Sequence, residues 1–148
     1  MGADYRILGR DSTIRVTQNG LLLAETAAVK VWDFKPVVTL LSEGFIGEAA
    51  KRHREIAEEV AVTYSVQPEG SQVMQMQYAV WQRARSGQAN NLQINIGFRL
   101  LFPSGTVVKI MVPDLKFDDI GNMSNPGREA FVAMTFSAKA GTYVPSFT

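Results

Sequence analysis

His53 is the only histidine of the sequence and the residue best suited to acid–base chemistry near neutral pH. It stands between Arg52 and Arg54, whose positive charges disfavour its protonated form. A catalytic triad or a zinc site needs further partners, and the sequence contains neither a cysteine nor a G-x-S-x-G motif. The residue types therefore exclude a cysteine nucleophile and a zinc centre built from several His or Cys ligands.

The carboxylates form no recognisable catalytic or metal site either. Asp114, Asp118 and Asp119 lack the D-x-D-x-D-G spacing of a calcium loop, so a solvated turn is the simpler interpretation. Glu58 and Glu59 are adjacent, and adjacent side chains point apart on a helix or a strand. The stretch G-F-I-G lacks the G-K-[ST] ending of a phosphate loop. We therefore expect no enzyme, no cofactor and no metal.

The densest run of charge is more suggestive of an interaction surface. In F-I-G-E-A-A-K-R-H-R-E-I-A-E-E, residues 45–59, acidic residues flank a basic block. A mixed-sign run is more typical of a protein–protein contact than of a phosphate track, and an ordinary solvated surface is the alternative. Ala49, His53, Ile56 and Val60 share one face at helical spacing, so the local pattern predicts an amphipathic helix.

The composition is that of one ordinary globular domain. The 148 residues are 46% hydrophobic and 20% charged, with a formal net charge of +1, which gives no general preference for nucleic acid or membranes. Without cysteine there are no disulfides. The first residues lack an apolar segment of signal-peptide length, and no apolar run approaches the ~20 residues that span a bilayer. We expect a single domain over residues 1–148 that does not insert into a membrane.

Alternating apolar residues predict strands on both sides of the chain's middle. Residues 13–17 and 21–24 flank Asn19-Gly20, a strong hairpin signal. Residues 29–41 form the longest β-like stretch, where Pro36 predicts an edge position, a bulge or a bend. Further strands are expected at residues 60–66, 94–102, 106–112 and 128–138, and the loop-rich segment before the last one leaves room for a short strand at 115–117.

Residues 71–86 change to a helical period. Tyr78 and Trp81 are predicted to anchor this helix in the core, because aromatic side chains bury the largest areas. Arg83 and Arg85 suit the negative end of the helix dipole, and Gly87 suits the C-cap. The apolar stripe of the helix consists of Val73, Met76, Val80 and Ala84. The fold class is therefore mainly β, an antiparallel β-sandwich or barrel with one flanking α-helix at about residues 71–86.

The order of these features resembles a known family. A hairpin leads to V-K-V-W-D-F-K-P, a long connection L-L-S-E-G-F-I-G-E precedes the strand V-A-V-T-Y-S-V, and the helix ends in R-A-R-S-G. Over roughly residues 12–140, this order resembles the tail tube proteins of long-tailed bacteriophages, which are related to the tubes of contractile injection systems. The resemblance implies a non-enzymatic virion protein that forms hexameric rings, which stack into a hollow tube through which DNA passes into the host.

The resemblance also implies roles for particular segments. Residues 44–59 would be an assembly loop or arm, flanked in the domain by an N-terminal arm at 1–12 and an irregular, docking C-terminal tail at 139–148. Within the assembly arm, an extended loop is expected at 44–54 and a strand from Glu55 onward, with a short helix as the alternative. The residues expected to contact neighbouring subunits are Phe45 and Ile46 as apolar anchors, and Lys51, Arg52, His53, Arg54 and Glu55 in the charged part.

The implied partners are further copies of the chain, in stacked hexameric rings, and other tail proteins: a sheath if the tail is contractile, a tape measure, and a baseplate or initiator. The implied location is the virion tail, and the host cytoplasm during assembly. Two other functions stay open: a single-ring tail component such as a terminator or adaptor, and a monomeric β-sandwich binding module.

Overall fold

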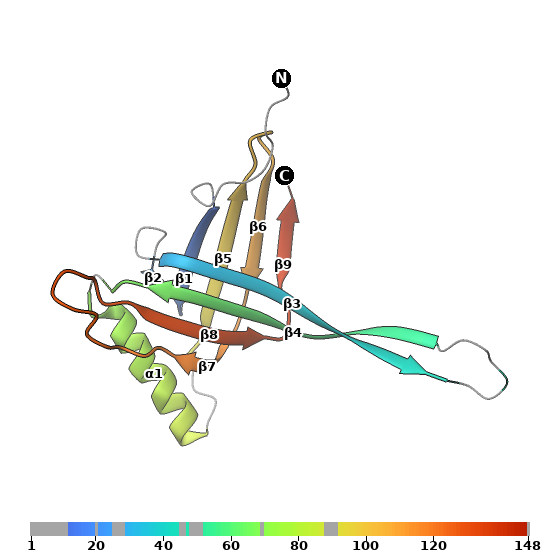
Figure 1. Ribbon diagram of the computed structural model, residues 1–148, viewed down its shortest axis with the longest axis horizontal. Helices are drawn as coiled ribbons and strands as arrows, with labels where there is room; N and C mark the ends of the chain where they lie inside the picture. The colour runs from blue at the N-terminus through green and yellow to red at the C-terminus, as the bar shows by residue number, and fades with distance from the viewer. Residues whose placement is uncertain are drawn as a thin grey trace.

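The computed structural model describes residues 12–19, 21–24, 29–44, 47, 52–68, 70–87 and 92–147, and these form two antiparallel sheets and one helix (Figure 1). The five-stranded sheet has the order β2-β1-β5-β6-β9, and the four-stranded sheet the order β3-β4-β8-β7. The strands of the first sheet are β1 (Ser12–Gln18), β2 (Leu21–Ala24), β5 (Ile94–Leu101), β6 (Val107–Val112) and β9 (Val144–Phe147). Those of the second are β3 (Val29–Glu43), β4 (Arg52–Val66), β7 (Lys116–Ile120) and β8 (Met134–Ala140).

The two sheets pack face to face with their strands running crosswise, and the core lies between them (Figure 1). Each sheet contributes alternate residues to this core, as the period of two requires. Trp32 and Phe34 of β3 cross the gap to Phe98 of β5, with ring centroids 4.5 and 5.6 Å apart. Tyr64 of β4 stacks on Phe136 of β8 at 5.2 Å. The predicted mainly β sandwich is thus confirmed, and both sheets are open rather than closed into a barrel among the described residues.

The predicted hairpins are also confirmed. β1 pairs with β2 through a turn in which Asn19 has a φ of 50°, the left-handed conformation that asparagine tolerates. The backbone N–H of Asn19 donates to the carbonyl of Gln93, and the N–H of Gln93 donates to Asn19 Oδ1. This exchange fixes the turn against the start of β5, which pairs with β1 on one side and β6 on the other.

Helix α1 (Gln72–Ser86) lies where the sequence predicts it and ends at Gly87, whose φ of 66° is left-handed. The prediction that Tyr78 and Trp81 are core anchors is wrong within this chain, because their side chains are 62% and 55% exposed. The helix instead buries the residues that share the opposite stripe: Val73, Met76, Val80 and Arg83. The buried stripe passes through Arg83, whereas Ala84 is exposed.

Several strand boundaries differ from the prediction. Pro36 lies on the edge strand β3, and the register between β3 and β4 shifts at the next pair, Val37 and Val38, as the proline suggested. The last predicted strand begins at Met134 and not at residue 128, because the glycine and proline before it favour turns. The tail expected to be irregular contains β9, which pairs with β6.

Residues 52–59 do not form the helix that the apolar spacing of residues 47–59 suggested. Arg52 to Glu59 belong to β4, so the strand begins three residues earlier than the expected Glu55. Arg52, His53 and Arg54 are therefore strand residues, paired with Glu43, Ser42 and Leu41 of β3, and not loop residues. Cross-strand pairing with the long strand β3 satisfies their backbone groups and outweighs the local helical pattern.

Candidate assembly surfaces

The outer halves of β3 and β4 form a projecting ribbon, called here the arm, which consists of residues 38–43 and 52–58 (Figure 1). Every side chain in these two segments is exposed, whereas residues 60, 62, 64 and 66 of the same strand β4 are buried. A two-stranded ribbon that buries nothing is only marginally stable in water. A partner that covered the arm would therefore stabilise it.

The arm has two chemically different faces, because side chains alternate along each strand and cross-strand partners point to the same side. Leu40 pairs with Glu55, and Ser42 pairs with His53, whose Nδ1 lies 2.8 Å from Ser42 Oγ. We call this side the acidic face: Val38, Leu40, Ser42, His53, Glu55 and Ala57. The other side, the basic face, comprises Thr39, Leu41, Glu43, Arg52, Arg54 and Ile56.

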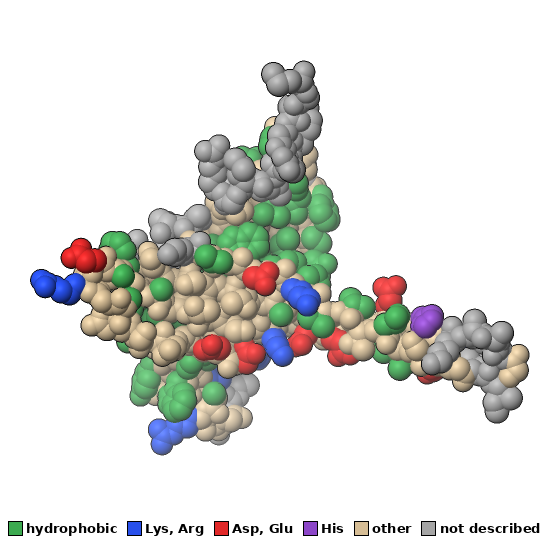
Figure 2. Space-filling model, viewed as in Figure 1, with side chains coloured by type: hydrophobic (Ala, Val, Ile, Leu, Met, Phe, Trp, Pro, Cys, Tyr) green, Lys and Arg blue, Asp and Glu red, His purple; other side chains and the backbone are tan. Residues whose placement is uncertain are grey.

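Both faces combine exposed apolar side chains with charge. Val38 and Leu40 on the acidic face are 56% and 59% exposed, and Leu41 and Ile56 on the basic face are also exposed. Each face of the ribbon thus exposes two large apolar side chains beside charged ones, a combination typical of interaction sites. Figure 2 shows apolar and acidic side chains and the histidine along this projection.

The predicted arm residues fall into two groups. Arg52, His53, Arg54 and Glu55 lie together on the outer part of β4, where their side chains are exposed. Phe45, Ile46 and Lys51 lie outside the described residues. Sequence reasoning missed Val38, Leu40 and Leu41 as arm residues, although apolar residues on both faces of the segment from residue 29 were a signal that a second partner exists.

The outer face of the four-stranded sheet is polar and carries charges in bands. One row across the sheet consists of Asp33, Thr63, Ser137 and Asp119, in cross-strand register. The next row consists of Lys35, Ala61, Lys139 and Lys116. Two of these lysines are close to carboxylates: Lys139 Nζ lies 3.5 Å from Glu59 Oε1, and Lys116 Nζ lies 3.2 Å from Asp114 Oδ1. Figure 2 faces this sheet, whose surface is largely neutral and polar between the charges.

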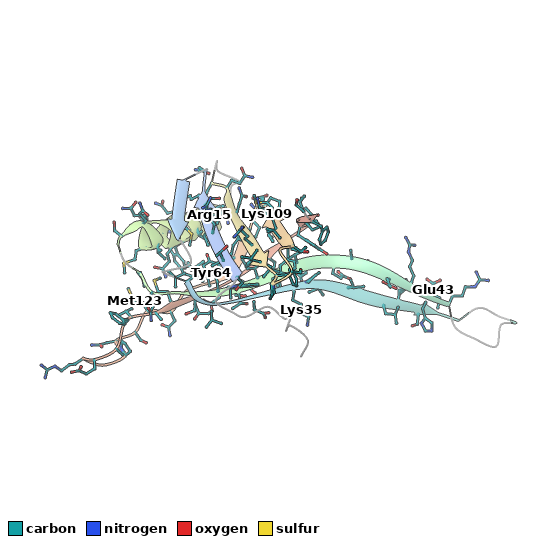
Figure 3. All side chains as sticks on the ribbon, turned by 90° about the horizontal axis from the view of Figure 1, so that it is seen from above. Arg15, Lys35, Glu43, Tyr64, Lys109 and Met123 are labelled. Atoms are coloured by element: carbon teal, nitrogen blue, oxygen red, sulfur yellow. The ribbon has the colours of Figure 1, made fainter. Side chains whose placement is uncertain are left out.

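The outer face of the five-stranded sheet carries a different set of charges. Its described strands carry Arg15, Arg99 and Lys109 and contain no Asp or Glu. Figure 3 places Arg15 and Lys109 on this sheet, Lys35 on the other, and Tyr64 between the two layers. The two outer faces of the sandwich therefore differ in charge, one basic and one mixed.

The buried polar groups of the described residues include the Arg83 guanidinium and the Tyr64 hydroxyl. The Arg83 guanidinium donates from Nη1 to the carbonyl of Leu92 at 3.1 Å and from Nη2 to that of Leu115 at 3.3 Å, so it joins α1 to the segments before β5 and β7. Burial raises the pKa of Tyr64 far above its ordinary value, and its hydroxyl has no hydrogen-bond partner among the described residues. Neither group is accessible to a substrate, so both are part of the scaffold.

The described residues lack two further kinds of feature. They contain no group of three or more His, Cys, Asp or Glu that could hold a metal ion. No helix in the described part of the chain has the length and apolar character needed to cross a membrane.

The fold is shared with chains of phage-like particles. A chain of the anti-feeding prophage cap, the tube terminating cap, has a TM-score of 0.59 at 11% identity, over 100% of this chain and 95% of that chain. A chain from the PVC sheath–tube complex, an extracellular contractile injection system in the extended state, has a TM-score of 0.58 at 9% identity, over 98% of this chain and 94% of that chain. A chain of the 6-fold symmetrised anti-feeding prophage baseplate has a TM-score of 0.53 at 13% identity, over 99% of this chain and 95% of that chain.

At these identities the likeness establishes the fold alone. It extends to cap and baseplate assemblies as well as to a sheath–tube complex, so it supports the resemblance found in the sequence without singling out a tail tube. No protein-family model matches the sequence, and no curated protein matches it.

Proposed function

We propose that this chain is a non-enzymatic structural subunit of a phage-tail-like particle, and that six copies form a ring that stacks into a hollow tail tube. The arm is the observation that carries this proposal. Its residues expose apolar and charged groups on both sides and lie outside the core of their own chain. A neighbouring subunit is the partner that would cover such a ribbon, and the fold shared with chains of contractile injection particles supports this.

The four-stranded sheet is the better candidate for the channel wall. β3 and β7 are its edge strands, so the sheets of adjacent copies could pair edge to edge into a continuous wall. Its outer face offers hydroxyls from Thr63 and Ser137 and carries both acidic and basic rows. A wall without a strong positive field would let DNA slide, because retention of DNA grows with the number of phosphates that cations neutralise.

The charged and apolar arm residues would make the contacts between subunits. We propose that Phe45 and Ile46 anchor in a neighbour, and that Lys51, Arg52, His53, Arg54 and Glu55 set the register by complementary charge. In this role the chain would reside in the particle, after assembly in the host cytoplasm. It would contact other tail proteins and meet DNA only during its passage.

A component that forms one ring and does not stack is the second candidate. The likeness to chains of the tube terminating cap and the baseplate favours it as much as the sheath–tube likeness favours a tube. The two candidates share the arm and differ in whether both faces of the ring accept another ring.

Negative-stain electron microscopy of the purified protein at low and high concentration tests the proposal. Long tubes with a central hole are expected for a tube subunit, and discrete rings for a cap or adaptor. Monomers at every concentration would contradict both and favour a monomeric binding module. Phe45→Asp, which places a charge at the proposed anchor, should abolish assembly while the subunit stays folded. Loss of the fold in that variant would place Phe45 in the core.

A further inference from the structure

The outer face of the five-stranded sheet contains a hollow of about 760 Å³. Gly97 lies at its centre, and the space where a side chain would stand is empty within 4 Å. Met111 and Val144 are Gly97's neighbours on the next two strands and supply exposed apolar surface, at 50% and 58% exposure. The floor of the hollow is therefore apolar, formed where a glycine interrupts a row of side chains.

The walls of the hollow are basic. Arg99 and Lys109 are directly opposite each other on β5 and β6, and Arg15 is opposite Gly97 on β1. All three line the hollow, together with the hydroxyls of Thr13 and Ser146. Like charges in direct cross-strand pairs destabilise a sheet, so the Arg99–Lys109 pair is a cost that the fold itself does not require. An anionic group between Arg99 and Lys109 would offset their mutual repulsion by attracting both.

The chemistry of the hollow favours a protein segment over nucleic acid. Phe98 is the one aromatic among the residues that line the hollow, and its side chain is buried in the core, so it is not available to stack on a base. Phosphates along a strand would call for a track of cations, whereas here the cations surround an apolar floor. The fitting ligand has a carboxylate beside an apolar side chain.

The acidic face of the arm carries this combination. Leu40 and Glu55 are direct cross-strand partners, so an exposed apolar side chain stands beside a carboxylate on the same face. Val38 extends the apolar surface by one step along β3. The basic face, with Arg54 opposite Leu41, has the wrong sign for the hollow.

We propose that the hollow receives the acidic face of the arm of a second copy, with Leu40 on Met111 and Glu55 beside Arg99. This inference rests on the proposed function and names the receiving surface for the arm. Because arm and hollow are different surfaces, the contact is head-to-tail, which is the geometry that generates rings or open stacks. The five-stranded sheet then faces protein, and the mixed-charge sheet is left for the channel.

Disulfide trapping tests the contact directly, because the chain has no cysteine of its own. In the double variant Leu40→Cys, Met111→Cys, oxidation should produce covalent chains of subunits on a non-reducing gel, since the two residues of neighbouring copies would be within bonding reach. The matched control is Leu41→Cys, Met111→Cys, which moves the thiol to the basic face and should give no ladder. Equal ladders from both variants, or none from the first, would overturn the inference.

Charge reversal gives a second, independent readout by sedimentation velocity. Glu55→Arg and Arg99→Glu should each raise the concentration at which half of the protein assembles by at least 10-fold. The two variants mixed, or combined in one chain, should restore assembly. Lys35→Glu, a reversal on the other sheet, should have no comparable effect. If the wild type forms rings or tubes and Arg99→Glu does so equally, the inference fails and the proposed function stands. If the wild type forms no particles and the Leu40→Cys, Met111→Cys variant gives no ladder, both the inference and the proposed function are overturned.

Discussion

Tyr64 shows how the core accommodates a polar atom at a cost. Its ring stacks on Phe136, while its buried hydroxyl finds no partner among the described residues. A buried hydroxyl without a hydrogen bond is destabilising because it has lost its bonds to water. The side chain is retained for its ring, and the oxygen is tolerated.

The variant Tyr64→Phe should therefore raise the free energy of unfolding by about 1 kcal/mol, measured by urea denaturation at neutral pH. Burial raises the folded-state pKa of Tyr64 above its ordinary value of 10.0, so the fold is more stable while this phenol is neutral than when it is ionised. Its contribution is lost as pH rises through about 10 and above, because the unfolded chain ionises first. The variant should lack this alkaline loss. Destabilisation by the variant at neutral pH would mean that the hydroxyl has a partner.

Arg83 connects the helix to the segments that precede β5 and β7. It is buried and donates to the carbonyls of Leu92 and Leu115. Arg83→Ala should lower the free energy of unfolding by about 2 to 3 kcal/mol, because two buried carbonyls lose charge-assisted partners. Arg85→Ala, on the exposed side of the same helix, should change it by no more than about 0.5 kcal/mol. Similar losses from both variants would contradict this role.

At the scale of elements, the helix buries one stripe and exposes its aromatic residues. Met76→Ala should cost about 2 to 5 kcal/mol in a urea titration, because it leaves a cavity between the helix and the sheets. Trp81→Ala should cost less than about 1 kcal/mol, since more than half of that side chain is already in solvent. A larger loss of stability from Trp81→Ala than from Met76→Ala would support Trp81 as the core anchor that the sequence suggested.

Strands and helices whose apolar residues recur regularly could be predicted from the sequence. The faces that these elements turn toward one another could be predicted only in part. The 94–112 hairpin and α1 follow from alternation and from Gly87. Periodicity correctly placed Val73, Met76 and Val80 on the buried stripe, whereas Tyr78 and Trp81 lie on the opposite side of the helix and were assigned to the core for their size alone. Arg83 lies at i+3 from Val80 and i+7 from Met76, which is the spacing of the buried stripe. Its charge, however, led to the expectation that it is exposed.

The arm illustrates the other limit of local pattern. Residues 52–59 read as helix because their apolar residues recur at helical spacing, yet they pair with β3 along their whole length. Pairing with β3, which comes from another part of the sequence, satisfies the backbone groups of these residues. Local periodicity carries no information about such a partner. Arg52, His53, Arg54 and Glu55 lie on the exposed arm, and their strand conformation could not be predicted from the local pattern. Their role in subunit contacts stays a prediction.

Removing the arm should separate folding from assembly. Val38 and Ala57 are direct partners across the ribbon, so Asn-Gly can replace residues 39–56 as a two-residue hairpin turn. We expect the shortened chain to keep its melting temperature within a few degrees, because the described residues among those deleted are exposed. We also expect it to remain monomeric in sedimentation velocity. Unfolding of this chain would show that the arm belongs to the folding unit.

At the scale of the whole molecule, strand β4 belongs to two environments. Residues 60–66 lie in the core sheet, between β3 and β8, while residues 52–58 are exposed. In dilute protein, hydrogen exchange should therefore be slow for the amides of 60–66 and fast for those of 52–58. Assembly should protect the second group without altering the first. Uniform protection along β4 in the monomer would contradict the view of the arm as an unpartnered extension.

The arm leaves the sandwich in one direction only (Figure 1). A stack of subunits joined arm to hollow is consequently polar. One end of the stack presents free arms, and the other end presents unoccupied hollows. Addition of subunits at the two termini then proceeds by different encounters and at different rates. The protein that starts such a stack must imitate one half of the joint, and the protein that stops its growth must imitate the other.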